Sequence, residues 1–330
     1  MKALHVTSHA ESADKIKLDL IEKPTPTLDK KNNCLIKVYA SGVNPSDALA
    51  ATGYFHHATL PRIPGRDFAG IIIEGPCHLK NKPVWGTGGA AGISFDGVQA
   101  EYIKLSEDEI SVCPSSLDLI TAGAQPLPYV TAYYSLVTRA NIKETETVLV
   151  VGALGHVGRA AMSICQWKNC KPIALVRSNS DLKKAKELNW LAISAEDNNL
   201  AEKILAANNN QPINAILNSV GNIYWEDYIK ILSEFGRIIT IGARDNVRDV
   251  NINLFNLYRA NQDLIGINSV ALDFKASAKL LDEIAAGFEA NKLSPLAVDP
   301  NMTYSPENAS EAYKEVMLGK TGKKPVIKFD

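Results

Sequence analysis

One short segment, Val151 to Gly158, constrains the fold of this chain more than any other. It reads Val-Gly-Ala-Leu-Gly-His-Val-Gly and joins the apolar run 147–152 to the segment 156–167, whose apolar residues recur at helical spacing. Small residues between a buried strand and a helix allow a tight turn. They also let backbone N–H groups and the positive end of the helix dipole approach a pyrophosphate. The segment therefore predicts a dinucleotide-binding strand–turn–helix unit.

The turn departs from the strict G-x-G-x-x-G pattern at one position. Ala153 stands where the first glycine is expected, and Gly155 and Gly158 fill the other two places. The alternative interpretation is an ordinary tight turn of an α/β protein, but strand, turn, helix and second strand occur in the order that a nucleotide site requires. His156 is either a phosphate contact or an exposed turn residue. The predicted cofactor contacts here are Gly152, Ala153, Leu154, Gly155, His156, Val157 and Gly158.

The residues after the second strand of this unit, 171–176, bear on the choice of cofactor. A site for NAD normally carries an acid about 20 residues past the turn, which binds the ribose 2′-hydroxyl. Here the chain has Arg177, Ser178 and Ser180, followed by Lys183. A guanidinium and hydroxyl groups can hold a 2′-phosphate, whereas a carboxylate repels it. These four residues therefore predict NADPH, with a solvated helix start as the alternative.

The rest of the chain divides into two patterns. Before residue 115, short β segments such as 34–40 and 68–74 are separated by glycine and proline, which indicates a β-rich, barrel-like domain. Between residues 116 and 137 the apolar spacing is helical, broken by Pro126 and Pro128. Apolar strands and helices then alternate, which predicts an α/β domain with a parallel sheet. The expected later elements are strands at 171–176, 215–218, 237–241, 263–267 and 325–329, and helices at 156–167, 181–188 and 276–290.

Composition limits the classes of partner. The 330 residues carry a net charge of −1 with both signs interspersed, which argues against a nucleic-acid or anionic membrane surface. No apolar run is long enough to cross a bilayer, and the five cysteines form no CxxC pair. We therefore expect a cytoplasmic protein with reduced thiols, no nucleic-acid partner and no membrane contact.

A series of sequence blocks resembles the medium-chain dehydrogenase/reductase superfamily, in its zinc-independent quinone oxidoreductase-like branch. The blocks lie at residues 42–47, 61–70, 96–102, 131–133, 151–158, 235–242 and 319–324. The resemblance implies a GroES-like catalytic domain at 1–121 and 273–330, a Rossmann domain at 122–272 and a homodimer. It also implies that the last strand returns to the first domain. Further cofactor contacts implied by the resemblance alone are Thr131, Val220, Ile241, Gly242, Ile267 and Asn268.

Two positions argue against a catalytic zinc ion. Zinc-dependent relatives have a cysteine at the place of Asn44 and a histidine at the place of Arg66. Asparagine is a poor zinc ligand, and an arginine that stays protonated cannot be one. No metal ligand is therefore predicted.

The resemblance implies that NADPH gives a hydride to a quinone or an α,β-unsaturated carbonyl compound. Asn44 is expected to donate toward the cofactor or the substrate oxygen, and Tyr54 to protonate the developing enolate. Relatives often have the tyrosine one residue later, where this chain has Phe55, and Asp47 is more consistent with a structural role than with a base. The alternatives are an enoyl-thioester reductase and a non-catalytic, crystallin-like NADPH-binding protein.

Overall fold

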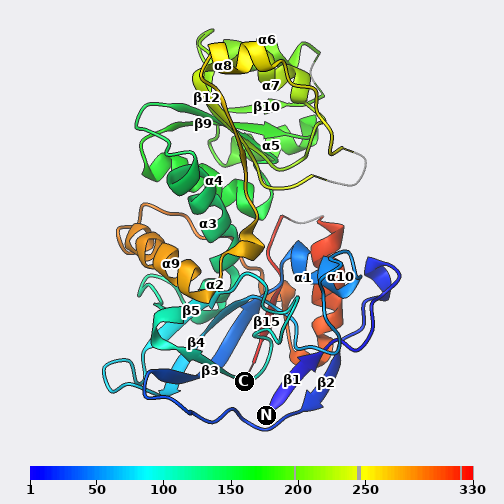
Figure 1. Ribbon diagram of the computed structural model, residues 1–330, viewed down its shortest axis with the longest axis vertical. Coiled ribbons are helices and arrows are strands. Elements are labelled where there is room, and N and C mark those ends of the chain that lie inside the picture. The colour runs from blue at the N-terminus through cyan, green and yellow to red at the C-terminus, as the bar shows by residue number, and fades with distance from the viewer. Residues whose placement is uncertain (197, 244–246, 320–321, 330) are drawn as a thin grey trace. The chain divides into compact units, whose positions relative to one another are not determined.

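A computed structural model describes residues 1–330 except 197, 244–246, 320–321 and 330. The chain forms two compact units: unit 1 is Met1–Val130 with Ser269–Asp330, and unit 2 is Thr131–Asn268 (Figure 1). The domain limits expected from the sequence, 121/122 and 272/273, lie within nine residues of these divisions and remain predictions. Part of one sequence block, residues 320–321, lies outside the described residues.

Unit 2 is built on a parallel sheet. Over the described residues its strands run in the order β10-β9-β8-β11-β12-β13 (Figure 1). Numbered from the first strand of the unit this is 3-2-1-4-5-6, the Rossmann order, which confirms the predicted fold. The strands are β8 (Thr147–Val151), β9 (Lys171–Val176), β10 (Ala192–Ser194), β11 (Ile213–Asn218), β12 (Leu232–Thr240) and β13 (Asp263–Gly266).

Helices join these strands, and all of them except α8 bury apolar residues. All five residues of β8 are buried, as expected for a parallel strand covered on both faces. α4 packs on β8 and β9, α5 on β9 and β10, and α7 on β12. The helices of unit 2 are α4 (His156–Trp167), α5 (Asn179–Glu187), α6 (Leu200–Ala207), α7 (Trp225–Ile231) and α8 (Leu254–Arg259).

Unit 1 is β-rich. Its main sheet has the order β14-β15-β3-β4-β5-β7, with β6 also paired to β3, and β1 pairs with β2. The strands are β1 (Lys2–His5), β2 (Asp19–Glu22), β3 (Asn33–Gly42), β4 (Asp67–Glu74), β5 (Pro83–Thr87), β6 (Tyr102–Ser106), β7 (Ser111–Val112), β14 (Thr303–Tyr304) and β15 (Val326–Lys328). The helices are α1 (Pro45–Ala51), α2 (Leu119–Ala124), α9 (Phe274–Glu289) and α10 (Ala309–Leu318).

The last strand confirms the predicted return of the chain. β15 pairs antiparallel with β3, with Val326 opposite Gly42 and Lys328 opposite Ala40. Figure 1 shows this red strand beside the blue strand of the amino-terminal segment. A GroES-like unit formed from both ends of the chain follows from this pairing.

The helical segment predicted over 116–137 is broken at Pro126, as expected, but not at Pro128. α2 ends at Ala124, and Pro126 is the first residue of α3 (Pro126–Tyr133), which contains Pro128 and continues into a π-helix over Tyr134–Arg139. At the first helical position the missing N–H has no intrahelical partner to lose, so proline is tolerated there. None of the helices in the described part of the chain is long and apolar enough to span a bilayer.

Candidate functional site

The turn between β8 and α4 requires glycine at two positions for separate reasons. Gly152 has φ of +73°, and a Cβ there would lie 2.6 Å from Ser219 Oγ. A Cβ on Gly158 would lie 2.3 Å from the Gly152 carbonyl oxygen and 2.7 Å from Ala153 Cα. Gly152 therefore makes the turn, and Gly158 lets the first turn of α4 pack against it.

The altered position of the motif also has a structural explanation. Ala153 is fully buried, while the left-handed conformation falls on Gly152, one residue earlier. Gly155 caps α4, and the nearest atom to an added Cβ would be the Gly152 oxygen at 3.3 Å. Ala153 thus fills a core position, and the exposed Gly155 leaves the start of the helix open to a ligand.

The predicted cofactor residues of unit 2 gather at one edge of its sheet. Because carboxyl ends of parallel strands share an edge, the segments after β8, β9, β11, β12 and β13 lie side by side there. The ends of β12 and β13 form an open groove of about 420 Å³. Its lining residues are Thr240, Ile241, Gly242, Ala243, Gly266, Ile267 and Asn268.

At the carboxyl end of β9 the predicted phosphate contacts form the first turn of α5. Ser178 caps the helix, since its Oγ accepts the Asp181 N–H at 3.3 Å, and it lies 2.9 Å from Ser180 Oγ. The Arg177 side chain is 87% exposed and lies 3.6 Å from the Asp181 carboxylate. Lys183 is exposed on the same turn. Cations and hydroxyls are therefore present at this point, together with an acid of the helix itself.

Two residues at the carboxyl end of β11, Asn218 and Ser219, also lie at this edge and were missed from the sequence. Ser219 Oγ donates to the Val151 carbonyl at 2.8 Å and so ties the loop after β11 to the glycine turn. Asn218 accepts the Val220 N–H at 3.1 Å and donates to the Gly221 carbonyl at 2.8 Å. The sequence does contain a signal for these residues, because the polar pair Asn218-Ser219 directly follows the apolar run 215–217. Thr131 lies on α3, where its carbonyl accepts Ser135 Oγ.

Unit 1 contains a second polar site, which we call the buried charge cluster: Asn44, Asp47, Arg66, Asp67 and Lys324. Each of these residues is at most 2% exposed. Asp67 is the centre, because its Oδ2 accepts the Asn44 amide at 2.9 Å and Lys324 Nζ at 3.2 Å. Its Oδ1 accepts the backbone N–H of Leu127 at 2.9 Å, close to the start of α3.

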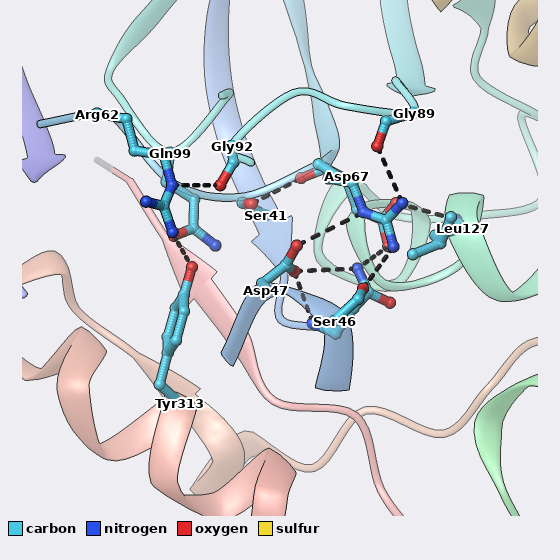
Figure 2. Close-up of polar contacts among 12 residues, drawn as sticks. Ser41, Ser46, Asp47, Arg62, Asp67, Gly89, Gly92, Gln99, Leu127 and Tyr313 are labelled. Carbon is cyan, nitrogen blue, oxygen red and sulfur yellow. Dashed lines mark hydrogen bonds and ion pairs between the residues drawn. The ribbon is translucent and has the colours of Figure 1, made fainter. Parts of the chain in front are cut away.

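The other acid of the cluster organises the start of α1. Asp47 Oδ2 accepts the backbone N–H of Asn44 at 2.8 Å and its side-chain amide at 3.2 Å (Figure 2). Arg66 Nε lies 3.7 Å from Asp47 Oδ1, and the guanidinium also donates to Ser46 Oγ and to the Gly89 carbonyl (Figure 2). These contacts agree with a structural role for Asp47.

Burial governs the electrostatics of the cluster. It raises the pKa of Asp47, which the nearby Arg66 cation opposes and Asp67 reinforces. It lowers the pKa of Arg66 and of Lys324, and both carboxylates oppose that shift. Two cations and two carboxylates thus compensate each other in a region that excludes water.

The two predicted catalytic residues of unit 1 lie in different environments. Both the oxygen and the nitrogen of the Asn44 side-chain amide are hydrogen-bonded. The oxygen accepts a bond from Lys324 Nζ, and the nitrogen donates to Asp47 and Asp67. Tyr54 follows α1, is 42% exposed and packs edge-to-face on Phe55 at 5.5 Å. Tyr54 is accessible to a substrate, whereas Asn44 holds the start of α1 in place.

The donor set of the cluster does not fit a zinc ion. Arg66 and Lys324 place two buried cations near Asn44, and both would repel a divalent cation bound there. Within the described residues, no group of three histidine, cysteine, aspartate or glutamate side chains is placed to hold a metal. By contrast, the glycine turn and the groove beside it fit a dinucleotide.

Comparisons with known proteins agree with this architecture. Residues 30–115 match the family model described as "Alcohol dehydrogenase GroES-like domain", and residues 157–285 match "Zinc-binding dehydrogenase". A zinc-type alcohol dehydrogenase-like protein of Schizosaccharomyces pombe is 32% identical over 306 residues, covering 92% of this chain and 89% of the relative. The human quinone oxidoreductase is 28% identical over 304 residues, covering 90% of this chain and 89% of the relative.

A solved structure extends the likeness to the whole fold. The Escherichia coli quinone oxidoreductase complexed with NADPH has a TM-score of 0.81 at 19% identity, with both chains covered completely. The Rossmann fold of unit 2 and its glycine turn, together with the GroES-like unit 1, define a two-domain oxidoreductase of the type that uses a nicotinamide cofactor. The chain belongs to the medium-chain dehydrogenase/reductase superfamily, in its quinone oxidoreductase-like branch.

Proposed function

We propose that the chain is an NADPH-dependent, zinc-independent reductase that passes a hydride to a quinone or an α,β-unsaturated carbonyl compound. One observation carries the proposal: the glycine turn, the first turn of α5 and the groove of β12 and β13 lie along one sheet edge. The human relative is a quinone oxidoreductase, and the Escherichia coli structure contains NADPH. Both support the proposal.

The residues of unit 2 would hold the cofactor in three parts. The turn Gly152–Gly158 would bind the pyrophosphate, and Arg177, Ser178, Ser180 and Lys183 would contact the 2′-phosphate. Ile241, Gly242, Ile267 and Asn268 would line the nicotinamide end, with Thr131 and Val220 as further contacts. When bound, the cofactor supplies the hydride.

Residues of unit 1 would control the proton. Tyr54 would donate its hydroxyl proton to the oxygen on which negative charge develops, directly or through water. Asn44 would act from within the buried charge cluster by fixing the start of α1, the helix that precedes Tyr54. The predicted direct contact of Asn44 with cofactor or substrate would require it to exchange its present partners.

The test is NADPH oxidation against quinones, enones and enoyl thioesters, each with and without a chelator. We expect turnover that chelator does not change. Tyr54→Phe should lower kcat by roughly 10²-fold, whereas Tyr304→Phe on β14 should leave it unchanged. Activity lost with chelator and restored by zinc would refute the metal-free mechanism. Tight NADPH binding without turnover across the panel would favour a binding protein.

We further propose a homodimer formed through the β13 edge of unit 2. α8 exposes three large apolar or aromatic side chains: Leu254 is 71% exposed, Phe255 61% and Tyr258 62%. Leu264 on β13 is 41% exposed. A second copy would cover this patch. Light scattering after gel filtration should give about 72 kDa, twice the chain mass of 35.8 kDa, and Leu254→Glu should give the monomer. A cytoplasmic location also remains a proposal, which cell fractionation would test.

A further inference from the structure

The first turn of α5 already contacts a carboxylate from another part of unit 2. Glu196 lies two residues beyond β10, and its Oε2 accepts the backbone N–H of Asn179 at 2.9 Å. Asn179 is the first residue of α5 and follows Arg177 and Ser178 directly. An acid from a distant loop therefore lies against the segment that is proposed to bind the 2′-phosphate.

The pairing of β9 and β10 explains how Glu196 reaches this place. The strands are parallel, with Ser194 opposite Val176, so both end at the same level. The Ala195 N–H then donates to the Val176 carbonyl at 2.8 Å, and the Glu196 N–H to Ser194 Oγ at 3.3 Å. The backbone is thus held to the end of β9 up to the residue that carries the carboxylate.

The cations of this segment are also balanced by their own helix. Asp181 lies 3.6 Å from Arg177 and 2.9 Å from Lys184 Nζ. With Asp181 and Glu196 together, two carboxylates oppose the positive charge at the carboxyl end of β9. The usual sequence rule expects the acid that binds the ribose 2′-hydroxyl at the end of the second strand, β9, where this chain has Arg177. The rule therefore does not detect Glu196, which follows the third strand, β10.

We infer that Glu196 is a specificity-determining residue of the cofactor site, which limits the preference for a ribose 2′-phosphate over a 2′-hydroxyl. The inference rests on the proposed function. A phosphate at the start of α5 approaches the Glu196 carboxylate and is repelled, whereas a 2′-hydroxyl can donate to it. Arg177 favours the phosphorylated cofactor, and Glu196 opposes that effect from the neighbouring loop.

The test compares adenosine 2′,5′-bisphosphate with 5′-AMP, because these probes differ at the 2′ position and need no substrate. Calorimetry would give Kd for both with the wild-type chain, Glu196→Gln and Glu187→Gln. Glutamine keeps an oxygen that can accept the Asn179 N–H and removes only the charge. Glu187 is exposed at the far end of the same helix, about 12 Å along it, and so is a control matched for net charge.

Glu196→Gln should tighten binding of the bisphosphate roughly tenfold and change 5′-AMP by less than about twofold. Glu187→Gln should change neither beyond about twofold. In turnover assays, the NADPH-to-NADH ratio of kcat/KM should rise by the same factor. If both nucleotides bind and Glu196→Gln leaves their Kd ratio at the wild-type value, the inference is wrong while the cofactor site stands. If neither nucleotide binds any of the three proteins, the proposed cofactor site fails and the inference fails with it.

Discussion

The glycine turn of unit 2 and the buried charge cluster of unit 1 are both compact polar sites, but they are assembled differently. The turn consists of consecutive residues, 151–158, and acts through backbone groups that small side chains leave accessible. The cluster consists of side chains from three segments of the chain, and the bond between Lys324 and Asn44 spans 280 residues. One site depends on local conformation, and the other exists only when β15 has joined β3.

The difference separates two ways of supporting a reaction. A backbone site tolerates little change in side-chain volume and leaves its groups open to a ligand. The side chains of the buried charge cluster bond mainly to one another, although Asp47 Oδ1 and Arg66 Nε form an ion pair at 3.7 Å without a hydrogen bond. The role of the cluster is to hold α1 and the start of α3 in place. We therefore expect substitutions in the turn to change nucleotide binding and substitutions in the cluster to change mainly stability.

The largest effect is expected for Lys324→Met, which leaves a buried carboxylate without its cation. The free energy of unfolding should fall by about 3–5 kcal/mol, measured by urea denaturation. Lys328→Met, four residues later on β15, removes an ammonium that lies 5.5 Å from the Tyr39 ring centre and should cost less than about 1 kcal/mol. Adding Asp67→Asn to Lys324→Met should restore part of the loss because no unpaired charge remains. A cost for Lys324→Met as small as that of Lys328→Met would show that the cluster is not a unit.

An intermediate effect on stability is expected for Gly158→Ala, because its new Cβ would overlap backbone atoms that cannot move aside. Unfolding free energy should fall by about 1–3 kcal/mol. Gly155→Ala should cost less than about 1 kcal/mol, since its Cβ meets one atom at 3.3 Å, yet should weaken ADP-ribose binding roughly tenfold by blocking the approach of the pyrophosphate. Equal stability losses for the two variants would contradict the geometry of the turn.

The smallest effect is expected for the charge pair of unit 2, Glu146 with Arg237, which is only partly buried. Burial favours a raised pKa for Glu146, but the two Arg237 bonds at 3.0 and 2.6 Å, the Lys143 backbone N–H at 2.9 Å and the positive charges of both residues together outweigh it and hold the pKa below its ordinary 4.5. The pair therefore stabilises the fold above pH 4.5 and loses its effect as the pH falls through the lowered pKa.

Glu146→Gln should accordingly lower the unfolding free energy by about 1–2 kcal/mol at pH 7. The difference from the wild type should shrink steadily below pH 4.5, as measured by urea unfolding over a pH series. A difference that stayed constant down to pH 3 would mean that the carboxylate charge contributes nothing.

The sequence was sufficient where structure depends on neighbouring residues. The helix expected over 156–167 is present with those limits, and the strands at 147–152 and 171–176 agree to within one residue. The helices expected to end at 167, 188 and 290 also end within one residue of those limits, although this chain uses asparagine where glycine is more usual after a helix. Asn169, Asn189 and Asn209 follow α4, α5 and α6 with φ between 54° and 57°.

The sequence was insufficient where distant segments meet. The pairing of Lys324 with Asp67 and the approach of Glu196 to Asn179 depend on strand order and register, which periodicity does not determine. Asn44 illustrates the limit: its residue type was informative about zinc, but its three partners within the cluster became visible only in the fold. Pro128 was expected to break the helix as Pro126 does, but it is the third residue of α3, where its missing N–H has no intrahelical partner to lose.

The return of β15 to β3 has a consequence for the synthesis of the protein. A ribosome releases unit 2 completely before it adds Lys324, and at 5–20 residues per second the interval between Asp67 and Lys324 is roughly 10–50 seconds. During that time the amino-terminal strands contain a carboxylate that is costly to bury without its cation. The nascent chain therefore presents a complete unit 2 while the β-sheet of unit 1 is still open, and that sheet is the part a chaperone at the exit tunnel would meet.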